Sequence, residues 1–172
     1  MPGFVIHLAI AKEYLKRHQE DGEDEQEFYR GVIAPDLLKK PESHYGPSTS
    51  EPDFECYAKE TGLSSSYERG YYLHLLTDKD FYLSYGDIFS EDFYHDYNKL
   101  NRRLIHTFQI QIPEEIKEIV KFEEGEPVVL RFMEMYNFIR GFAGNLKTLK
   151  DGPFFIKRKI EIIEARDGGI DC

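Results

Sequence analysis

Hydrophobic positions recur three or four residues apart over most of the chain, the spacing that gathers side chains on one face of an α-helix. The pattern predicts helices over residues 5–19, 25–34, 65–85, 90–109 and 127–144, a short helix between Pro113 and Gly125, and a last segment, 154–165, that fits a helix better than a strand. Residues 41–54 hold three prolines and a glycine, so they are expected to form a loop.

Residues typical of helix ends support these boundaries. Pro35 is expected to end the second helix, because proline has no backbone N–H and its ring crowds the preceding turn. The serines at 64–66 offer an N-cap to the long helix that follows, and Gly86 lies just past its end. No repeat or linker divides the sequence. It therefore predicts an all-α, single-domain multi-helix bundle over residues 1–172.

Composition and charge narrow the possible functions. The chain has 172 residues, which suits one domain, and 41% of them are hydrophobic. A net charge of -10 argues against nucleic acid or an anionic membrane as a partner, because phosphates require a basic surface. No apolar stretch approaches the ~20 residues of a membrane span, and the N-terminus has no signal-peptide pattern, so a cytoplasmic location is expected. Cys56 and Cys172 suggest neither a disulfide framework nor a metal-binding pair.

The residues with the most informative chemistry are three histidines and two aspartates in the first half of the chain. His74 and Asp78 stand four apart in an apolar run, so they share a helix face about 6 Å apart at Cβ. A buried Asp78 needs a partner, which is either His74, a cation or a metal ion. Upstream, His7 lies in an apolar helix, Asp36 at an apolar helix end and His44 in a loop. Their structural alternatives are a core histidine, a cap and an exposed loop side chain.

Together, His7, Asp36, His44, His74 and Asp78 fit a metal site built from side chains on facing helices. Nitrogen and oxygen donors without a thiolate favour a hydrolytic zinc, Mn, Fe or Ni site over electron transfer. Five ligands are too many for one tetrahedral zinc, so either one ion has more ligands or an aspartate bridges two ions. A bound ion lowers the pKa of its water and polarises a phosphoryl oxygen. Asp36, where it is not fully used as a ligand, is the candidate general base.

The arrangement resembles the zinc-dependent phospholipase C family and its single-strand nuclease relatives. The resemblance is carried by His7, Ala34-Pro35-Asp36, Ser43-His44-Tyr45 and His74-x-x-x-Asp78, over roughly the first half of the chain. It implies an all-helical zinc cluster that cleaves phosphodiesters. Asp36, His44, His74 and Asp78 would then surround one ion, and His7 would bind a second ion bridged by Asp78. Ser84 stands where the family has a histidine for a third ion, and the chain lacks the family's N-terminal Trp.

Two hypotheses of function from different classes follow. The first is a zinc-dependent hydrolase that uses one or two ions to cleave a small phosphorylated or phospholipid-like substrate, a phosphoester or phosphodiester. The second is a non-catalytic helical protein with a structural or vestigial metal site, which the incomplete third-ion set favours. A competing enzyme class, the helical metal phosphohydrolases, uses an adjacent His-Asp pair, and His95-Asp96 is such a pair. If helices 65–85 and 90–109 form an antiparallel hairpin, His95 lies beside Asp78.

Several side chains near the proposed ligands are candidates for a substrate cleft. They are Tyr45, Tyr71, Tyr72, Phe81 and Tyr82, for each of which helix packing is the alternative. Arg69 is a candidate for contact with an anionic substrate, and a surface ion pair is its alternative.

Overall fold

The computed structural model describes residues 2–18, 22–38 and 40–149, and it confirms the all-α fold class. The helices are α1 (Phe4–Arg17), α2 (Glu25–Leu38), α3 (Phe54–Thr61), α4 (Ser66–Tyr85), α5 (Asp92–Phe108) and α6 (Phe132–Asn145). Short 3-10 helices lie at Pro41–His44, Gly86–Ile88 and Glu114–Ile116, and the described ranges contain no strand. The helix expected over 154–165 lies outside the described residues.

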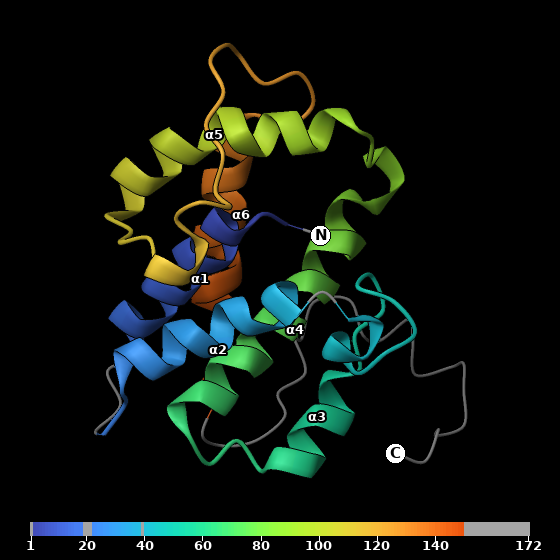
Figure 1. Ribbon diagram of the computed structural model, residues 1–172, viewed down its shortest axis with the longest axis vertical. Coiled ribbons are helices and arrows are strands. Elements are labelled where there is room, and N and C mark those ends of the chain that lie inside the picture. Colours follow the sequence, from blue (N-terminus) through green and yellow to red (C-terminus); the bar gives the residue numbers. More distant parts are fainter. Residues whose placement is uncertain (1, 19–21, 39, 150–172) are drawn as a thin grey trace.

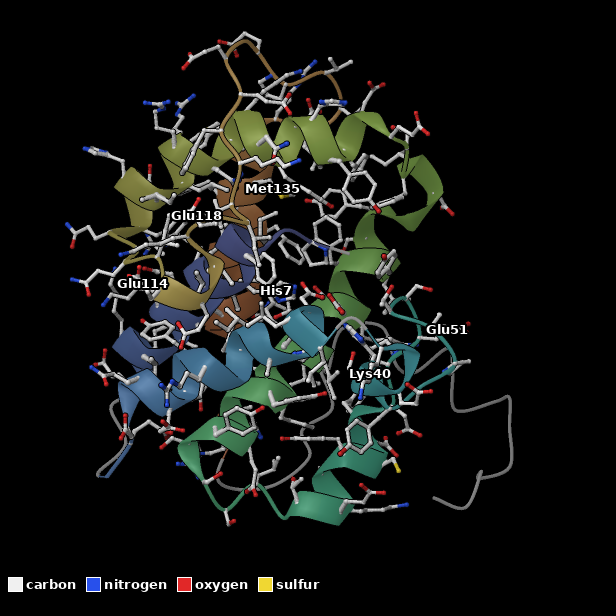
Figure 2. All side chains as sticks on the ribbon, in the orientation of Figure 1. His7, Lys40, Glu51, Glu114, Glu118 and Met135 are labelled. Carbon is white, nitrogen blue, oxygen red and sulfur yellow. The ribbon has the colours of Figure 1, made fainter. Side chains whose placement is uncertain are left out.

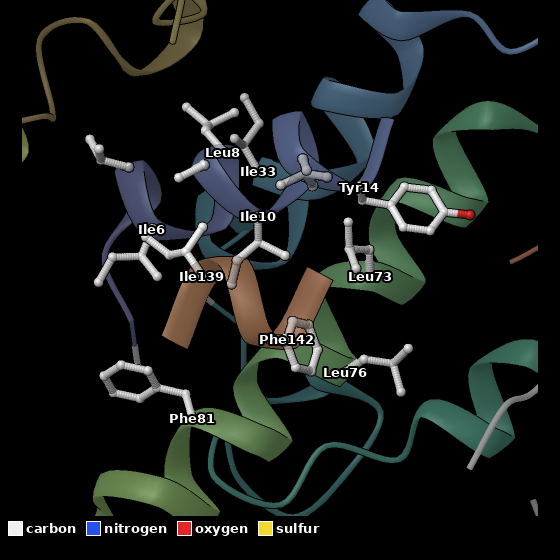
Figure 3. Packing of buried hydrophobic residues seen from close by; sticks show 14 of the residues in the cluster. Ile6, Leu8, Ile10, Tyr14, Ile33, Leu73, Leu76, Phe81, Ile139 and Phe142 are labelled. Atoms are coloured by element: carbon white, nitrogen blue, oxygen red, sulfur yellow. The ribbon is translucent and has the colours of Figure 1, made fainter. Parts of the chain in front are cut away.

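α1 is the central helix of the structure. It packs against α2, α4, α5 and α6, and its residues from Val5 to Ala11 are all buried (Figure 1). A helix that is apolar on every side requires neighbours on every side. In Figure 3, side chains of α1, α4 and α6 converge around Ile10 in the core. The uniformly apolar start of the sequence therefore forms the centre of the fold.

α2 and α4 approach closely where two glycines lie at their crossing. A Cβ built on Gly31 would lie 2.0 Å from the carbonyl oxygen of Tyr67, and a Cβ built on Gly70 would lie 2.0 Å from that of Phe28. Any larger residue at either position would have to push the two backbones apart. The contact holds the part of α4 that carries two proposed ligands directly against the end of α2 (Figure 1).

Pro35 does not end α2, so that prediction is wrong. The helix continues to Leu38. A proline removes only one N–H, here the donor to the carbonyl of Gly31, and one lost bond can be tolerated where the surroundings supply others. The carbonyl of Pro35 accepts a hydrogen bond of 2.9 Å from the hydroxyl of Ser43, which ties the end of α2 to the 3-10 helix. The additional turn keeps Asp36 on α2.

The remaining segments agree with the predicted helix boundaries to different degrees. α4 begins as expected, with a capping box in which Ser65 and Glu68 exchange hydrogen bonds. α3 was not expected from the hydrophobic pattern, and its first turn is capped by the side chain of Asp53. The expected helix after Pro113 is only a 3-10 turn, and α6 begins at Phe132 rather than at 127. The N–H groups of residues 128–130, which precede α6, bind the carboxylate of Asp96 on α5.

α4 and α5 do not form the packed antiparallel hairpin considered above. After α4 the chain passes through the 3-10 helix Gly86–Ile88, with Gly86 in a right-handed rather than left-handed conformation. α5 then packs mainly against α1 and lies across one end of the molecule (Figure 1). The expectation that His95 lies at the height of Asp78 is therefore wrong.

Candidate metal centre

The structure brings all five predicted ligands together at the buried meeting point of four elements. His7 comes from α1, Asp36 from α2, His44 from the 3-10 helix, and His74 and Asp78 from α4. The most exposed of them, Asp36, is 8% exposed, and Asp78 is fully buried. Figure 2 shows His7 in the middle of the molecule, close to α1 and α2.

The donor atoms of these residues lie at distances typical of ligands that share an ion. The Nε2 atoms of His44 and His74 are 3.3 Å apart, and Asp78 Oδ2 is 3.0 Å from the first and 3.3 Å from the second. Asp36 Oδ1 is 3.7 Å from both nitrogens. Two ligands of a tetrahedral zinc lie about 3.3 Å apart, given Zn–N bonds of about 2.0 Å. The spacing therefore fits a small divalent cation.

Asp78 faces histidines on two sides. Its Oδ2 approaches His44 and His74, whereas its Oδ1 lies 3.3 Å from His7 Nε2. The ligand atoms accordingly form two overlapping triads, Asp36 with His44 and His74, and His7 with His74 and Asp78, each within 4.8 Å. A carboxylate with one oxygen toward each of two histidine groups has the geometry required of a bridge between two ions.

Hydrogen bonds outside the cluster determine which nitrogen of each imidazole is protonated. His74 Nδ1 lies 2.7 Å from the carbonyl oxygen of Val32, which only accepts, so this nitrogen carries the proton. The Ser43 hydroxyl lies 2.9 Å and 2.7 Å from two backbone carbonyl oxygens and has one proton to give. It must therefore accept from His44 Nδ1, at 3.0 Å. In the neutral imidazoles both Nε2 atoms then present lone pairs to each other, and a cation between them removes that repulsion.

Several of the proposed metal-ligand atoms have no hydrogen bond to any described residue. They are both nitrogens of His7, both oxygens of Asp78 and Oδ1 of Asp36. The short contacts of Asp78 attract electrostatically but lack hydrogen-bond geometry. Buried carboxylate oxygens normally accept hydrogen bonds. The lack of hydrogen bonds to these oxygens is therefore a second indication of a cation site.

The electrostatic balance of the cluster also favours a cation. Burial alone raises the pKa of Asp78, but His74, His44 and His7 together hold it well below its usual value, so the carboxylate is ionised. Burial and the neighbouring His74, whose ring stacks on that of His7 at 3.9 Å, lower the pKa of His7. Burial alone lowers the pKa of His74, but Asp78 and Asp36 raise it. A proton on His74 is therefore the alternative to a metal ion in the cluster.

A cleft of about 720 Å³ opens onto one side of the cluster. Asp36 and His44 line it, whereas the other three ligands do not. Lys40 and Lys121 also line it, and neither forms an ion pair with another described residue. The opposite wall includes Tyr94, Tyr97, Asn98 and Asn101 of α5, together with residues 119–121. The cleft thus joins the cluster to solvent past two lysines.

Neither His95 nor Asp96 belongs to the cluster, and the two side chains contact different parts of the protein. The side chain of His95 is 63% exposed, and its Nδ1 lies 2.9 Å from Glu123 Oε2. Asp96 is buried and accepts three backbone hydrogen bonds of 2.6–2.9 Å from residues 128–130. The interpretation that makes this pair the centre of a phosphohydrolase site is therefore wrong for the described structure.

The aromatic residues expected at the cleft are not among those that line it. Tyr71 donates a hydrogen bond to the Ser43 carbonyl, and Tyr72 and Phe81 are in the core. Tyr45 packs on Tyr57. The cleft residues of α5 recur at 94, 97, 98 and 101, a helical stripe that could have indicated one shared face.

Arg69 is not available to a substrate. It is buried, and it donates to Glu23 through Nε and Nη2 at 2.9–3.3 Å. Its candidate role in binding an anion is therefore wrong, and the cations of the cleft are the two lysines.

Comparisons with protein-family models, curated proteins and solved structures found no match to the chain. None of the described helices is long and apolar enough to cross a membrane. Function must therefore be argued from the chemistry of the cluster and its cleft.

Proposed function

We propose that the protein is a metal-dependent phosphoester hydrolase that binds one or two zinc ions through His7, Asp36, His44, His74 and Asp78. One observation carries the proposal: buried imidazole nitrogens and carboxylate oxygens converge to within 3.0–3.7 Å of one another beside an open cleft, and several of them have no hydrogen bond among the described residues. Bound zinc lowers the pKa of water and stabilises negative charge on a phosphoryl oxygen. The same donor set also accepts Mn, Fe or Ni.

The chain's own residues have separate roles in this proposal. Val32 and Ser43 hold the imidazoles of His74 and His44 with Nε2 toward the ion. Asp78 supplies a ligand oxygen to each side of the cluster. Asp36 lines the cleft and lies farther from His44 and His74 than Asp78 does, which supports a role as general base where it is not fully used as a ligand.

The two lysines indicate the kind of substrate. Lys40 and Lys121 lie in the cleft without carboxylate partners among the described residues, although the chain has a net charge of -10. Local positive charge in a negatively charged protein favours binding of an anion in this cleft. A small phosphorylated or phospholipid-like substrate fits that charge, whereas a nucleic acid would require a more extended basic surface.

A second hypothesis is a structural metal site in a non-catalytic protein. Ser84, which is exposed, offers no ligand for a third ion and favours this alternative. Structural zinc sites are closed by protein ligands, whereas catalytic sites keep an open position. Because Asp36 and His44 line the cleft, the geometry favours catalysis.

Metal analysis combined with an activity assay tests the proposal. The purified wild type is expected to contain at least one equivalent of zinc and to hydrolyse bis(p-nitrophenyl) phosphate. His74→Ala is expected to lose zinc and to reduce turnover by about 10³-fold or more. His106→Ala, which changes an exposed histidine of α5, is the matched control and should change neither. Zinc-free wild type would reject both hypotheses, and zinc-loaded protein inactive on a broad ester panel would support the structural site.

A further inference from the structure

The cleft contains a buried hydroxyl that the folded chain leaves without a partner. Tyr97 of α5 lines the cleft and is only 4% exposed. Its hydroxyl has no hydrogen bond within the described part of the chain. Burying an unpaired hydroxyl costs free energy, so this arrangement is favourable only when something else in the cleft supplies the acceptor.

The neighbouring polar side chains of the cleft are already engaged. Asn98 Nδ2 donates to Glu123 Oε1 at 2.8 Å, and Asn101 Nδ2 donates to the carbonyl of Lys121 at 2.9 Å. The ring of Tyr97 packs against Phe81, and Gly3 lies beside it, with its Cβ position 3.5 Å from the ring. Tyr97 is thus a fixed donor whose hydroxyl is not used within the fold.

The charge environment keeps this hydroxyl protonated and relates it to the metal centre. Burial, then the phenols of Tyr82 and Tyr94, then Asp78 and Asp36, raise the pKa of Tyr97. The phenol therefore remains a hydrogen-bond donor at neutral pH. Tyr97 lines the same cleft as Asp36 and His44, so a molecule bound in that cleft can meet the phenol and the cluster together.

We propose that Tyr97 donates a hydrogen bond to a phosphoryl oxygen of the substrate held at the metal centre, a proposal that rests on the proposed function. An anionic oxygen is the acceptor that best compensates a neutral buried donor, because charge-assisted hydrogen bonds are the stronger kind. The ammonium groups of Lys40 and Lys121 are flexible and attract charge from any direction. Tyr97 adds a fixed direction, so it positions the phosphoryl group.

The substitution Tyr97→Phe tests this, because it removes the hydroxyl and keeps the ring. The variant is expected to retain the zinc content of the wild type and an equal or higher melting temperature. Its Kd for inorganic phosphate, measured by calorimetry on the zinc-loaded protein, should rise about 10-fold or more, as expected for a lost hydrogen bond to an anion. Its kcat/KM on bis(p-nitrophenyl) phosphate should fall by about 10- to 100-fold.

Tyr29→Phe is the matched control. The Tyr29 hydroxyl is also buried without a partner among the described residues, but it lies in a different hollow with Glu25 and Gln26. This variant should bind phosphate and turn over substrate as the wild type does. Unchanged phosphate binding in Tyr97→Phe, an equal loss in Tyr29→Phe, or loss of zinc from Tyr97→Phe would overturn the role of Tyr97. Zinc-loaded wild type that neither binds phosphate nor hydrolyses the diester would instead overturn the proposed function.

Discussion

Asp78 and Asp96 are both completely buried, and the fold satisfies them in opposite ways. Asp96 accepts three backbone N–H groups, whereas neither oxygen of Asp78 accepts a hydrogen bond from a described residue. A buried carboxylate whose oxygens are satisfied by the backbone organises a loop. One that faces only histidines has its lone pairs free for a ligand. Hydrogen-bond satisfaction therefore separates Asp96 from the proposed ligand Asp78 more clearly than the residues beside each in sequence do.

Helix geometry explains why the sequence pattern around Asp96 is misleading. Adjacent residues on a helix point about 100° apart, and in α5 the exposed His95 contacts Glu123 whereas Asp96 binds the backbone of residues 128–130. Residues four apart share a face, and His74 Nε2 indeed lies 3.3 Å from Asp78 Oδ2. In this structure the side chains of the spaced pair converge and those of the adjacent pair do not.

The largest effect is expected from Asp78→Asn. An amide has one acceptor oxygen and cannot supply a ligand to each side, so zinc binding should be lost and turnover should fall by about 10³-fold or more. Zinc at 1,000 times its Kd would stabilise the wild type by about 4 kcal/mol. Melting temperatures with EDTA and with zinc measure this difference. If zinc still raises the melting temperature of Asp78→Asn, Asp78 does not differ from Asp96 in the way proposed.

Asp96→Asn should have the complementary effect. Hydrogen bonds to a charged group contribute about 1.5–3 kcal/mol each. The asparagine side chain keeps one acceptor oxygen and no charge, so weakening or losing some of the three hydrogen bonds should lower the free energy of unfolding by about 2–4 kcal/mol. The zinc content should not change, because the cluster does not include this residue. Urea denaturation and metal analysis of the same sample test both expectations, and a variant as stable as the wild type would contradict the first.

The same carboxylate predicts a pH dependence. Burial alone raises the pKa of Asp96, but the N–H groups of residues 128–130 and the nearby Lys99 lower it below its usual value. Its contribution to stability is therefore complete above about pH 4 and is lost as the pH falls through the lower folded-state pKa. In EDTA, the wild type should lose stability below about pH 4 more steeply than Asp96→Asn does. Urea denaturation at several pH values measures the two slopes, and parallel slopes would argue against this assignment.

A smaller effect is expected from Ser43→Ala, which removes the acceptor for His44 Nδ1 but no ligand. Partners of this kind typically contribute 10- to 100-fold, or about 1.4–2.7 kcal/mol, to metal affinity. Competition for zinc with a chromogenic chelator measures the change. Ser48→Ala is the control, because its hydroxyl bonds Ser50 rather than a ligand. Equal affinities for the two variants would mean that Ser43 does not orient His44.

The smallest effect is expected from His95→Ala. This side chain is largely exposed and contacts Glu123 rather than the cluster. Zinc content and turnover should both equal those of the wild type. A loss of zinc from His95→Ala would support a phosphohydrolase site at His95 and Asp96 instead. Asp96 would then be the metal-binding aspartate.

The sequence could predict what depends on local spacing. The buried faces of α1, α4 and α5 and the pair His74 and Asp78 follow from the period of a helix. Asp36, His44 and His7 are joined to this pair by residue type and by resemblance to a known family. The end of α2 could not be predicted, because the bond from Ser43 to the Pro35 carbonyl joins positions eight residues apart. The segment just before α6 is held by Asp96, which lies 32–34 residues earlier in the sequence.

The cleft was beyond prediction for the same reason. Its far wall depends on the direction that the chain takes after Gly86, which no local pattern specifies. The orphan hydroxyl of Tyr97 likewise becomes visible only when the neighbours of every buried polar atom are known. Residue type, spacing and the resemblance therefore suggested the members of the cluster, and the structure was needed to identify what faces them.

The crossing at Gly31 and Gly70 has a consequence for redesign. Backbone lies against backbone there, so the separation of α2 and α4 does not depend on the side chains of the cleft. The far wall comes from α5 and residues 119–121, which contribute none of the five ligands. If the proposed function holds, substitutions at Tyr94 or Ile119 would reshape the cleft while the distances within the cluster stay as they are. Tyr97 on the same wall would have to be kept, because its hydroxyl is proposed to position the substrate.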